Sequence, residues 1–367
     1  MDNRTGILLL EDGTVFYGTS HGTPKTSAGE ICFNTGMTGY QEIFTDPSYF
    51  GQIVVASTSH IGNYGIHSDE SESKSVKING FVCKNFSPIH SRVRESETLQ
   101  SYFERENIPA ISNVDTRKLV RHIREKGAMN AIISNDGTSL EALKEQLSKV
   151  PPMKGRELAS KVSTKEKYEL GAADSPYRVA VIDLGVKENT LRSSVKRNAL
   201  VGVFPYNVSF EELMEWKPDG VIVSNGPGDP EPLKAVIEVV GKIIDANIPV
   251  LGICLGHQII ALSQGLSTFK MFNGHRGINH PLKNLLTGKC EVSSQNHGFA
   301  VSRESCEDNE NIQITHIHLN DNTVAGIQIK GKPVISVQHH PEACPGPNDS
   351  AYLFDDFFKL IQEHKGK

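Results

Sequence analysis

The sequence predicts an α/β protein with a mixed α+β N-terminal domain, residues 1–150, and a C-terminal doubly wound, mostly parallel sheet, residues 178–367. Three observations support this fold class. A length of 367 residues favours two domains. Residues 151–177 are polar and rich in residues that interrupt helices and strands, which is typical of a linker. Beyond them, strand-like and helix-like patterns alternate, which indicates βαβ units.

The N-terminal part carries weaker patterns. Short apolar runs and glycine-rich turns predict strands up to about residue 60. A helical pattern follows at 116–126 with Asp115 as its cap, and another at 140–147 after Ser139. This part has no catalytic set of its own, and we expect it to contact a partner.

The C-terminal part alternates regularly. In chain order we predict a strand at 179–183, a helix at 187–196, a strand at 200–204, a helix opened by a Ser209–Glu212 capping box, a strand ending at Ser224, a helix at 233–246 and a strand leading into Cys254. In such a sheet, the loops that follow neighbouring parallel strands meet at one edge. Cys254 and the loop after Ser224 should therefore lie close together.

Cys254 has the surroundings of a reactive nucleophile. It lies between Gly252 and Gly256, after the apolar run 248–251 and before the helix-forming run 258–262. This pattern predicts a sharp strand–nucleophile–helix turn, which projects the reactive atom above the end of a strand. The helix N-terminus behind the sulfur favours the thiolate.

A second pattern supplies a base. The apolar alternation in 334–338 predicts a strand that ends at Pro341. Residues two apart in an extended chain share a side, so His340 and Glu342 should lie together. A carboxylate beside an imidazole fixes its tautomer and stabilises the imidazolium, and the histidine can then take a thiol proton and return it to a leaving amine.

A third pattern is the loop 224–230, which is dense in glycine and proline. Such a loop turns tightly and leaves backbone N–H groups exposed. We expect the N–H groups of Gly228 and Leu255 to bind the oxygen that becomes negative when Cys254 attacks a carbonyl.

Together these three segments resemble the class I glutamine amidotransferases, which carry G-x-C-x-G-x-Q, N-G-P-G and H-P-E in this order. The N-terminal half narrows the resemblance. Its segments 33–42, 45–49, 60–63, 115–117 and 121–127 are similar to the small, glutamine-hydrolysing subunit of carbamoyl phosphate synthetase. The resemblance covers essentially the whole chain.

The resemblance implies an activity and a set of site residues. Cys254, His340 and Glu342 would form a triad that hydrolyses L-glutamine to glutamate and ammonia through a thioester. Gly228 and Leu255 would form the oxyanion hole. The positions that match the family's glutamine contacts are Ser48, Gly226, Gly228, Leu255, Gln258, Asn296, Gly298 and Phe299.

The resemblance also implies a partner. Ammonia would pass to a large ATP-dependent subunit, in a heterodimer or an assembly of heterodimers, which makes carbamoyl phosphate from bicarbonate for arginine or pyrimidine biosynthesis. The chain contains neither G-x-x-x-x-G-K-[ST] nor G-x-G-x-x-G after a strand. We therefore expect no cofactor on this chain, and ATP and Mg on the partner.

Composition disfavours a nucleic-acid-binding, a secreted or a membrane-spanning protein. A net charge of −5 gives no indication of nucleic-acid binding. Six scattered cysteines favour a reducing cytoplasm. Met1–Arg4 lead into only four apolar residues before Glu11, so we expect no signal peptide, and the apolar region around Cys254 is too short and polar to span a membrane.

Histidines near the C-terminus could suggest zinc. His316 alternates with His318, and His339 and His340 lie near Cys344. Zinc ligands usually have closer spacing, and His340 is better used as a base, so we predict no metal site.

Three alternatives remain open at this stage. The chain could serve a different amidotransferase, although such a glutaminase would lack the segment 37–40. It could be a hydrolase or peptidase that uses the same triad without a partner. It could also be a non-catalytic glutamine-binding regulatory subunit.

Overall fold

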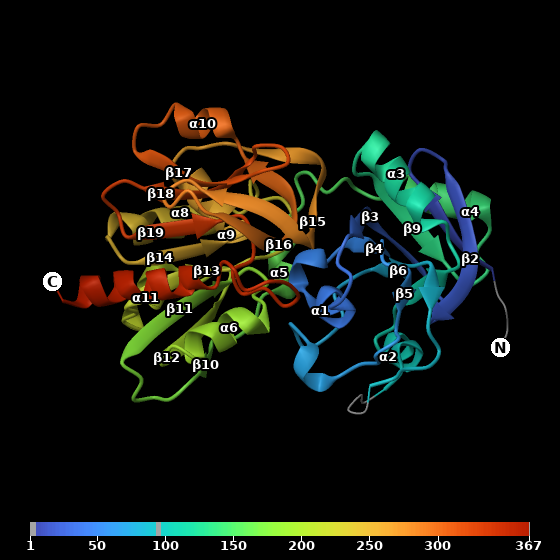
Figure 1. Ribbon diagram of the computed structural model, residues 1–367, viewed down its shortest axis with the longest axis horizontal. Coiled ribbons are helices and arrows are strands. Elements are labelled where there is room, and N and C mark those ends of the chain that lie inside the picture. Colours follow the sequence, from blue (N-terminus) through green and yellow to red (C-terminus); the bar gives the residue numbers. More distant parts are fainter. Residues whose placement is uncertain (1–4, 93–96, 367) are drawn as a thin grey trace. The chain divides into compact units, whose positions relative to one another are not determined.

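The computed structural model describes residues 5–92 and 97–366. The chain divides into two compact units, Met1–Met153 and Lys154–Lys367 (Figure 1). The prediction that no signal peptide is present used Met1–Arg4. These residues lie outside the described ones.

The N-terminal unit is built around a closed barrel with the strand order β1-β2-β8-β6-β4-β3-β9, counted over the described residues. A short β5–β7 pair stands apart from it. The strands are β1 (Thr5–Leu10), β2 (Val15–Gly22), β3 (Thr26–Asn34), β4 (Gln52–Ala56), β5 (His60–Ile61), β6 (Gly80–Val82), β7 (Asn85–Phe86), β8 (Pro109–Ser112) and β9 (Asn130–Ser134).

Helices accompany this barrel, as a mixed α+β domain requires. They are α1 (Tyr40–Thr45), α2 (Leu99–Arg105), α3 (Thr116–Lys126) and α4 (Leu140–Leu147), with the 3₁₀ turns η1 (Pro47–Tyr49) and η2 (Ser68–Glu70). The predictions for α3 and α4 are confirmed with their caps, because Asp115 accepts from Lys118 N and Ser139 accepts from Ala142 N. Gly127, at φ 92°, ends α3 in a conformation that favours glycine.

The C-terminal unit contains a sheet with the order β10-β12-β11-β13-β14-β19-β18-β17-β15-β16 in the described residues. Its strands are β10 (Tyr168–Leu170), β11 (Tyr177–Asp183), β12 (Ala199–Pro205), β13 (Gly220–Val223), β14 (Val250–Ile253), β15 (Thr268–Asn284), β16 (Cys290–Val301), β17 (Ile312–His318), β18 (Val324–Ile329) and β19 (Val334–Val337). The run from β12 through β11, β13 and β14 to β19 is parallel, as predicted.

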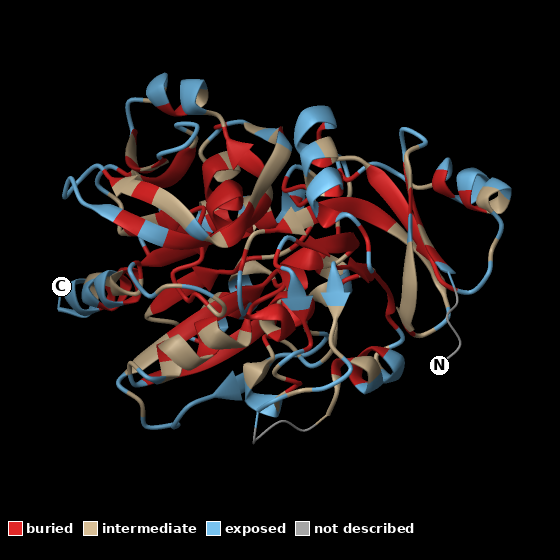
Figure 2. Cartoon of the chain, turned by 45° about the vertical axis from the view of Figure 1, so that its right-hand side comes forward, coloured by how far each residue is buried: buried red, intermediate tan, exposed pale blue. Residues whose placement is uncertain are grey.

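Helices cover both faces of the parallel strands, which confirms the doubly wound fold class. The helices of the C-terminal unit are α5 (Ala159–Val162), α6 (Glu188–Val195), α7 (Phe210–Glu215), α8 (Lys234–Asp245), α9 (Leu255–Ser263), α10 (Arg303–Glu307) and α11 (Tyr352–Lys365). Val221 and Val223 of β13 share a buried cluster with α7, α8 and α9, whereas Ile222 shares one with α6 and α11. Figure 2 shows buried strands with exposed stretches of α11 and α10 outside them.

Two features differ from a simple βαβ repeat. Beyond β19 the sheet continues antiparallel through β18, β17, β15 and β16. Strands joined as hairpins need no crossover helix, so the alternation that identified the parallel strands is absent there. The stretch 151–177, interpreted as a linker, contains α5 and β10, and β10 pairs with β12.

No helix in residues 5–92 and 97–366 combines the length and the apolar character needed to cross a bilayer.

Candidate active site

Cys254 occupies the one-residue turn between β14 and α9. Its backbone has φ 52° and ψ −100°, a strained conformation for a residue with a side chain. Neighbouring atoms lie too close to the two flanking residues for either to carry a side chain, so both must be glycine. A Cβ on Gly252 would lie 2.4 Å from Ile260 Cδ1, and one on Gly256 would lie 2.0 Å from the Val223 carbonyl oxygen.

Neighbouring strands hold this turn in place. Cys254 N donates to the Val337 carbonyl at the end of β19 at 2.8 Å, and Gly256 N donates to the Ser224 carbonyl after β13 at 3.0 Å. The ends of β13, β14 and β19 therefore meet at the sulfur. This meeting confirms that Cys254 and the loop after Ser224 lie at one edge of the sheet.

His340 and Glu342 form a buried pair. His340 Nδ1 lies 2.6 Å from Glu342 Oε1, and each residue is 2% exposed. The expectation that the strand runs to Pro341 is wrong, because β19 ends at Val337. The chain turns after this strand, and His340 N donates to the Ser294 carbonyl at 3.0 Å. The turn, rather than strand alternation, brings the two side chains together.

The ionised forms of His340 and Glu342 stabilise each other. Burial alone would lower the pKa of His340, but the Glu342 carboxylate and the Cys254 sulfur raise it to about 10. Burial would raise the pKa of Glu342, but Lys187 and the imidazolium of His340 hold it below its usual range. His340 Nε2 makes no hydrogen bond of good geometry with any described group, although the nearby sulfur affects its pKa. This nitrogen can receive the thiol proton.

Two groups contact the Cys254 sulfur at 3.6 Å: the Asn296 carbonyl oxygen and Gln338 Nε2. Gln258, predicted to hold substrate, donates through Nε2 to the Phe299 carbonyl at 2.8 Å and to Gln338 Oε1 at 3.0 Å. Asn296 and Phe299 are on β16, with Gly298 half-buried between them. The structure thus brings Gln258, Asn296 and Phe299 to the same place as Cys254.

Of the two predicted oxyanion donors, Leu255 lies next to the sulfur and Gly228 lies in the loop after β13. Leu255 is the first residue of α9, directly after Cys254. Gly228, at φ 92°, forms an isolated bridge with Glu157. A Cβ on Gly226 would lie 2.1 Å from the Leu184 carbonyl oxygen, which explains the glycine there.

Ser48, the remaining predicted substrate contact, lies in the N-terminal unit. It is part of η1, it is 4% exposed, and its backbone N–H donates to Asp46 Oδ1 at 2.8 Å.

Comparison with known proteins identifies the family. Residues 8–133 match the family model described as "Carbamoyl-phosphate synthase small chain, CPSase domain", and residues 180–360 match "Glutamine amidotransferase class-I". The chain is 45% identical over 352 residues to the carbamoyl phosphate synthase small chain of Clostridium perfringens, covering 96% of this chain and 98% of that one. The chain belongs to the carbamoyl phosphate synthase small chain family.

Other members are equally similar. The small chain of Oceanobacillus iheyensis is 45% identical, with 98% of this chain and 97% of that chain covered. The small chain of Vibrio parahaemolyticus is 45% identical, with 99% of each chain covered. The resemblance predicted from the motifs is confirmed, as is the presence of a class I glutamine amidotransferase domain in a small-chain protein.

Sequence reasoning missed Lys187, which belongs to the site of this small-chain protein. Its Nζ lies 3.2 Å from Glu342 Oε1 and also donates to the Ala343 carbonyl, and the side chain is 2% exposed. Asn189 adds a hydrogen bond from Nδ2 to the Glu342 carbonyl. A lysine at the start of a helix is usually exposed, so nothing in the sequence indicated this contact.

The buried ion pair predicts a large stability effect. Changing Lys187 to Met should destabilise the C-terminal unit by about 3–5 kcal/mol, because Glu342 loses a buried counter-charge. Urea unfolding followed by the fluorescence of Trp216, the single tryptophan, measures this directly. Lys242→Met removes an exposed pair with Glu238 and should leave the unfolding free energy close to wild type. Equal effects of the two changes would contradict the assignment.

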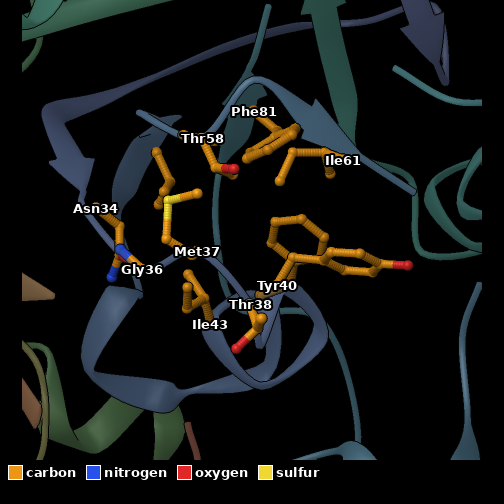
Figure 3. Close-up of a pocket in the computed structure, with 12 residues that line it drawn as sticks. Asn34, Gly36, Met37, Thr38, Tyr40, Ile43, Thr58, Ile61 and Phe81 are labelled. Carbon is orange, nitrogen blue, oxygen red and sulfur yellow. The ribbon is translucent and has the colours of Figure 1, made fainter. Parts of the chain in front are cut away.

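A small apolar pocket occurs in the N-terminal unit (Figure 3). Met37, Thr38 and Tyr40, from the segment that carries the small-chain resemblance, line it with Ile61 and Phe81. Its lining residues include no histidine, cysteine or carboxylate. Its polar side chains are the Asn34 amide, the hydroxyls of Thr38 and Thr58 and the Tyr40 phenol.

Proposed function

We propose that this chain hydrolyses L-glutamine and supplies ammonia for the synthesis of carbamoyl phosphate. One observation carries the proposal. The sulfur of Cys254 lies at a strained turn in front of a helix, and the buried His340–Glu342 pair interacts with it. This arrangement has the three parts of an activated nucleophile: the attacking atom, its base and the group that orients the base.

The first half of the reaction forms a thioester. His340 Nε2 takes the thiol proton, and Cys254 Sγ attacks the side-chain carboxamide carbon of glutamine. The N–H groups of Leu255 and Gly228 stabilise the oxyanion. The carbon–nitrogen bond then breaks, and His340 gives its proton to the leaving nitrogen, so that ammonia departs. Glu342 and Lys187 hold the imidazole in place and balance its charge.

The second half regenerates the enzyme. His340 takes a proton from water, the hydroxide attacks the thioester carbonyl, and the same N–H groups stabilise the second oxyanion. Collapse of this intermediate releases glutamate and returns the proton to the Cys254 sulfur.

The segments around the sulfur would hold the substrate. We assign glutamine contacts to Gln258 and to Asn296, Gly298 and Phe299 of β16, with the loop of Gly226 and Gly228 beside them. The hydrogen bonds of Gln258 support a positioning role, since they fix both Phe299 and Gln338. Ser48, in the N-terminal unit, is the remaining position that matches the family's glutamine contacts, and it stays a prediction.

A partner would use the ammonia. Membership of the small-chain family supports a large subunit that binds ATP and Mg and makes carbamoyl phosphate from bicarbonate, in a heterodimer or a larger assembly. The product would serve arginine or pyrimidine biosynthesis. The scattered cysteines support a cytoplasmic location.

The match over residues 8–133 disfavours the alternative that this chain supplies ammonia to a different amidotransferase, because the matched domain is that of the carbamoyl phosphate synthase small chain. Reconstitution tests the two remaining alternatives. With the large subunit from a related organism, glutamine plus bicarbonate and ATP should yield carbamoyl phosphate, with glutamate released in step. A hydrolase without a partner would release glutamate at the same high rate when alone. A regulatory subunit would release none in either case.

A further inference from the structure

Three histidines converge in the antiparallel half of the C-terminal sheet. They are His275 and His280 of β15 and His318 at the end of β17. One ring nitrogen of each lies within 4.8 Å of those of the other two. None of the three belongs to the Cys254–His340–Glu342 triad, and the proposed glutaminase mechanism does not use them, although His275 pairs with His297 on β16, next to the proposed glutamine contact Asn296.

An irregular strand creates this cluster. His275 and His280 are five residues apart, so a regular strand would direct them to opposite faces. The pairing of β15 with β16 changes from Gly277↔Gln295 to His280↔Ser293, which places one extra residue on β15. This bulge reverses the alternation and brings both rings to one side. Leu282 pairs with His318, so β17 delivers the third ring next to them.

The distances suit a small cation. His280 Nδ1 and His318 Nε2 are 3.0 Å apart. Two nitrogens bound at about 2.0 Å to a tetrahedral zinc ion lie about 3.3 Å from each other. The His275 ring stacks on that of His318 with centroids 4.0 Å apart. Three imidazoles this close repel one another when protonated, whereas each neutral imidazole has a nitrogen lone pair that a cation can accept.

Asp321 orients two of the rings. Its Oδ2 lies 2.8 Å from His275 Nε2, and its Oδ1 lies 3.3 Å from His318 Nδ1. Thr323 fixes the carboxylate by donating to Oδ1 from its backbone N–H at 3.1 Å and from Oγ1 at 2.9 Å. A carboxylate that accepts the second ring N–H leaves the other nitrogen free to bind a metal, and this is the usual arrangement around metal-bound histidine.

We propose that His275, His280 and His318 bind one divalent transition-metal ion, with Zn²⁺ as the occupant and Asp321 as the carboxylate that orients the ligands. Imidazole nitrogen is a preferred ligand of zinc, and three of them leave a fourth position for water. The side chain of His318 is 1% exposed and that of His275 is 11% exposed, so an ion can enter from the His275 side. The ion would tie the middle of β15 to the end of β17.

The cluster has a competing arrangement without metal. Asn320 N lies 3.2 Å from His318 Nδ1 and can donate to it, in which case His318 Nε2–H donates to His280 Nδ1. Such a hydrogen-bonded set would have no affinity for a cation beyond that of a surface histidine. Direct metal binding separates the two arrangements.

The experiment uses the full chain, freed of metal with a chelator. Titration with Co²⁺ should give the visible absorption of four-coordinate cobalt, saturating at one ion per chain, and added Zn²⁺ should abolish that absorption. His280→Gln should remove the bands. Asp321→Asn should keep them but weaken Zn²⁺ binding by about 10- to 100-fold, since it removes an orienting carboxylate rather than a ligand.

Two controls make the outcome decisive. His364→Gln, a change in α11 far along the chain from the cluster, should leave the affinity and stoichiometry unchanged. Circular dichroism checks that His280→Gln is folded. The proposal is overturned if wild type takes up no cobalt at stoichiometric concentration, or if a folded His280→Gln variant binds zinc as tightly as wild type. The wild-type titration alone is sufficient should that variant not fold.

Discussion

Cys254→Ser should abolish glutamine hydrolysis, with a loss of at least about 10⁴-fold in kcat. The serine hydroxyl would occupy the same turn but is a far weaker nucleophile than a cysteine sulfur beside a histidine base. When the nucleophile of a triad is removed, its base no longer has a proton to accept. Single changes of the nucleophile therefore cause some of the largest losses of kcat. Glutamate release from saturating glutamine measures the effect.

A second substrate and a second cysteine control this result. With the large subunit and added ammonium, Cys254→Ser should still support carbamoyl phosphate synthesis, because only the source of ammonia is lost. Cys306→Ser changes another buried cysteine, which packs in the core of the C-terminal unit, and should retain glutamine hydrolysis. A Cys254→Ser protein that continued to use glutamine would refute the assignment of the nucleophile.

Glu342→Gln should lower kcat for glutamine hydrolysis by about 10²- to 10⁴-fold while the KM changes little. The amide keeps the size of the side chain but loses the charge that stabilises the imidazolium, and it can hold the wrong tautomer of His340. Glu291→Gln replaces another buried carboxylate, which accepts from Ser350 and Tyr352, and should leave kcat close to wild type. A similar loss in both variants would indicate a general structural effect.

The same variant should change how stability depends on pH. In wild type, burial would lower the pKa of His340, but the Glu342 carboxylate and the Cys254 sulfur together raise it from 6.5 to about 10. The resulting stabilisation is fully present below pH 6.5 and is lost as the pH rises through the raised pKa. Without the carboxylate, only the Cys254 sulfur opposes the effect of burial, so the pKa of His340 falls and this alkaline loss of stability becomes smaller. The difference in unfolding free energy between wild type and Glu342→Gln should therefore shrink from pH 6.5 to about pH 10.

Local patterns were sufficient to predict the parallel half of the sheet and the turn at Cys254. The apolar strands, the capping box at Ser209 and the glycines at 252 and 256 act within a few residues, and each is found where it was predicted. The pairing of His340 with Glu342 was also predicted, although a turn rather than a strand achieves it.

The features that we did not predict from the sequence depend on packing between residues far apart in the chain or on strand irregularities. Lys187 and Glu342 are far apart in the chain, and only the folded structure brings that ammonium to the carboxylate. The histidine cluster depends on a bulge in β15, which reverses side-chain direction without any signature in the residue pattern. Gln338 contacts the sulfur from the end of a predicted strand, where its position two residues before His340 was the available clue.

The most direct test is to trap the covalent intermediate. Wild-type protein mixed with glutamine and quenched in acid within one turnover should carry a γ-glutamyl group on the peptide that contains Cys254, detected by mass spectrometry and released by hydroxylamine. Glu342→Gln should form the adduct more slowly, and Cys254→Ser should show none at this position. Glutamate release without an adduct on Cys254, or an adduct on another cysteine, would contradict the account.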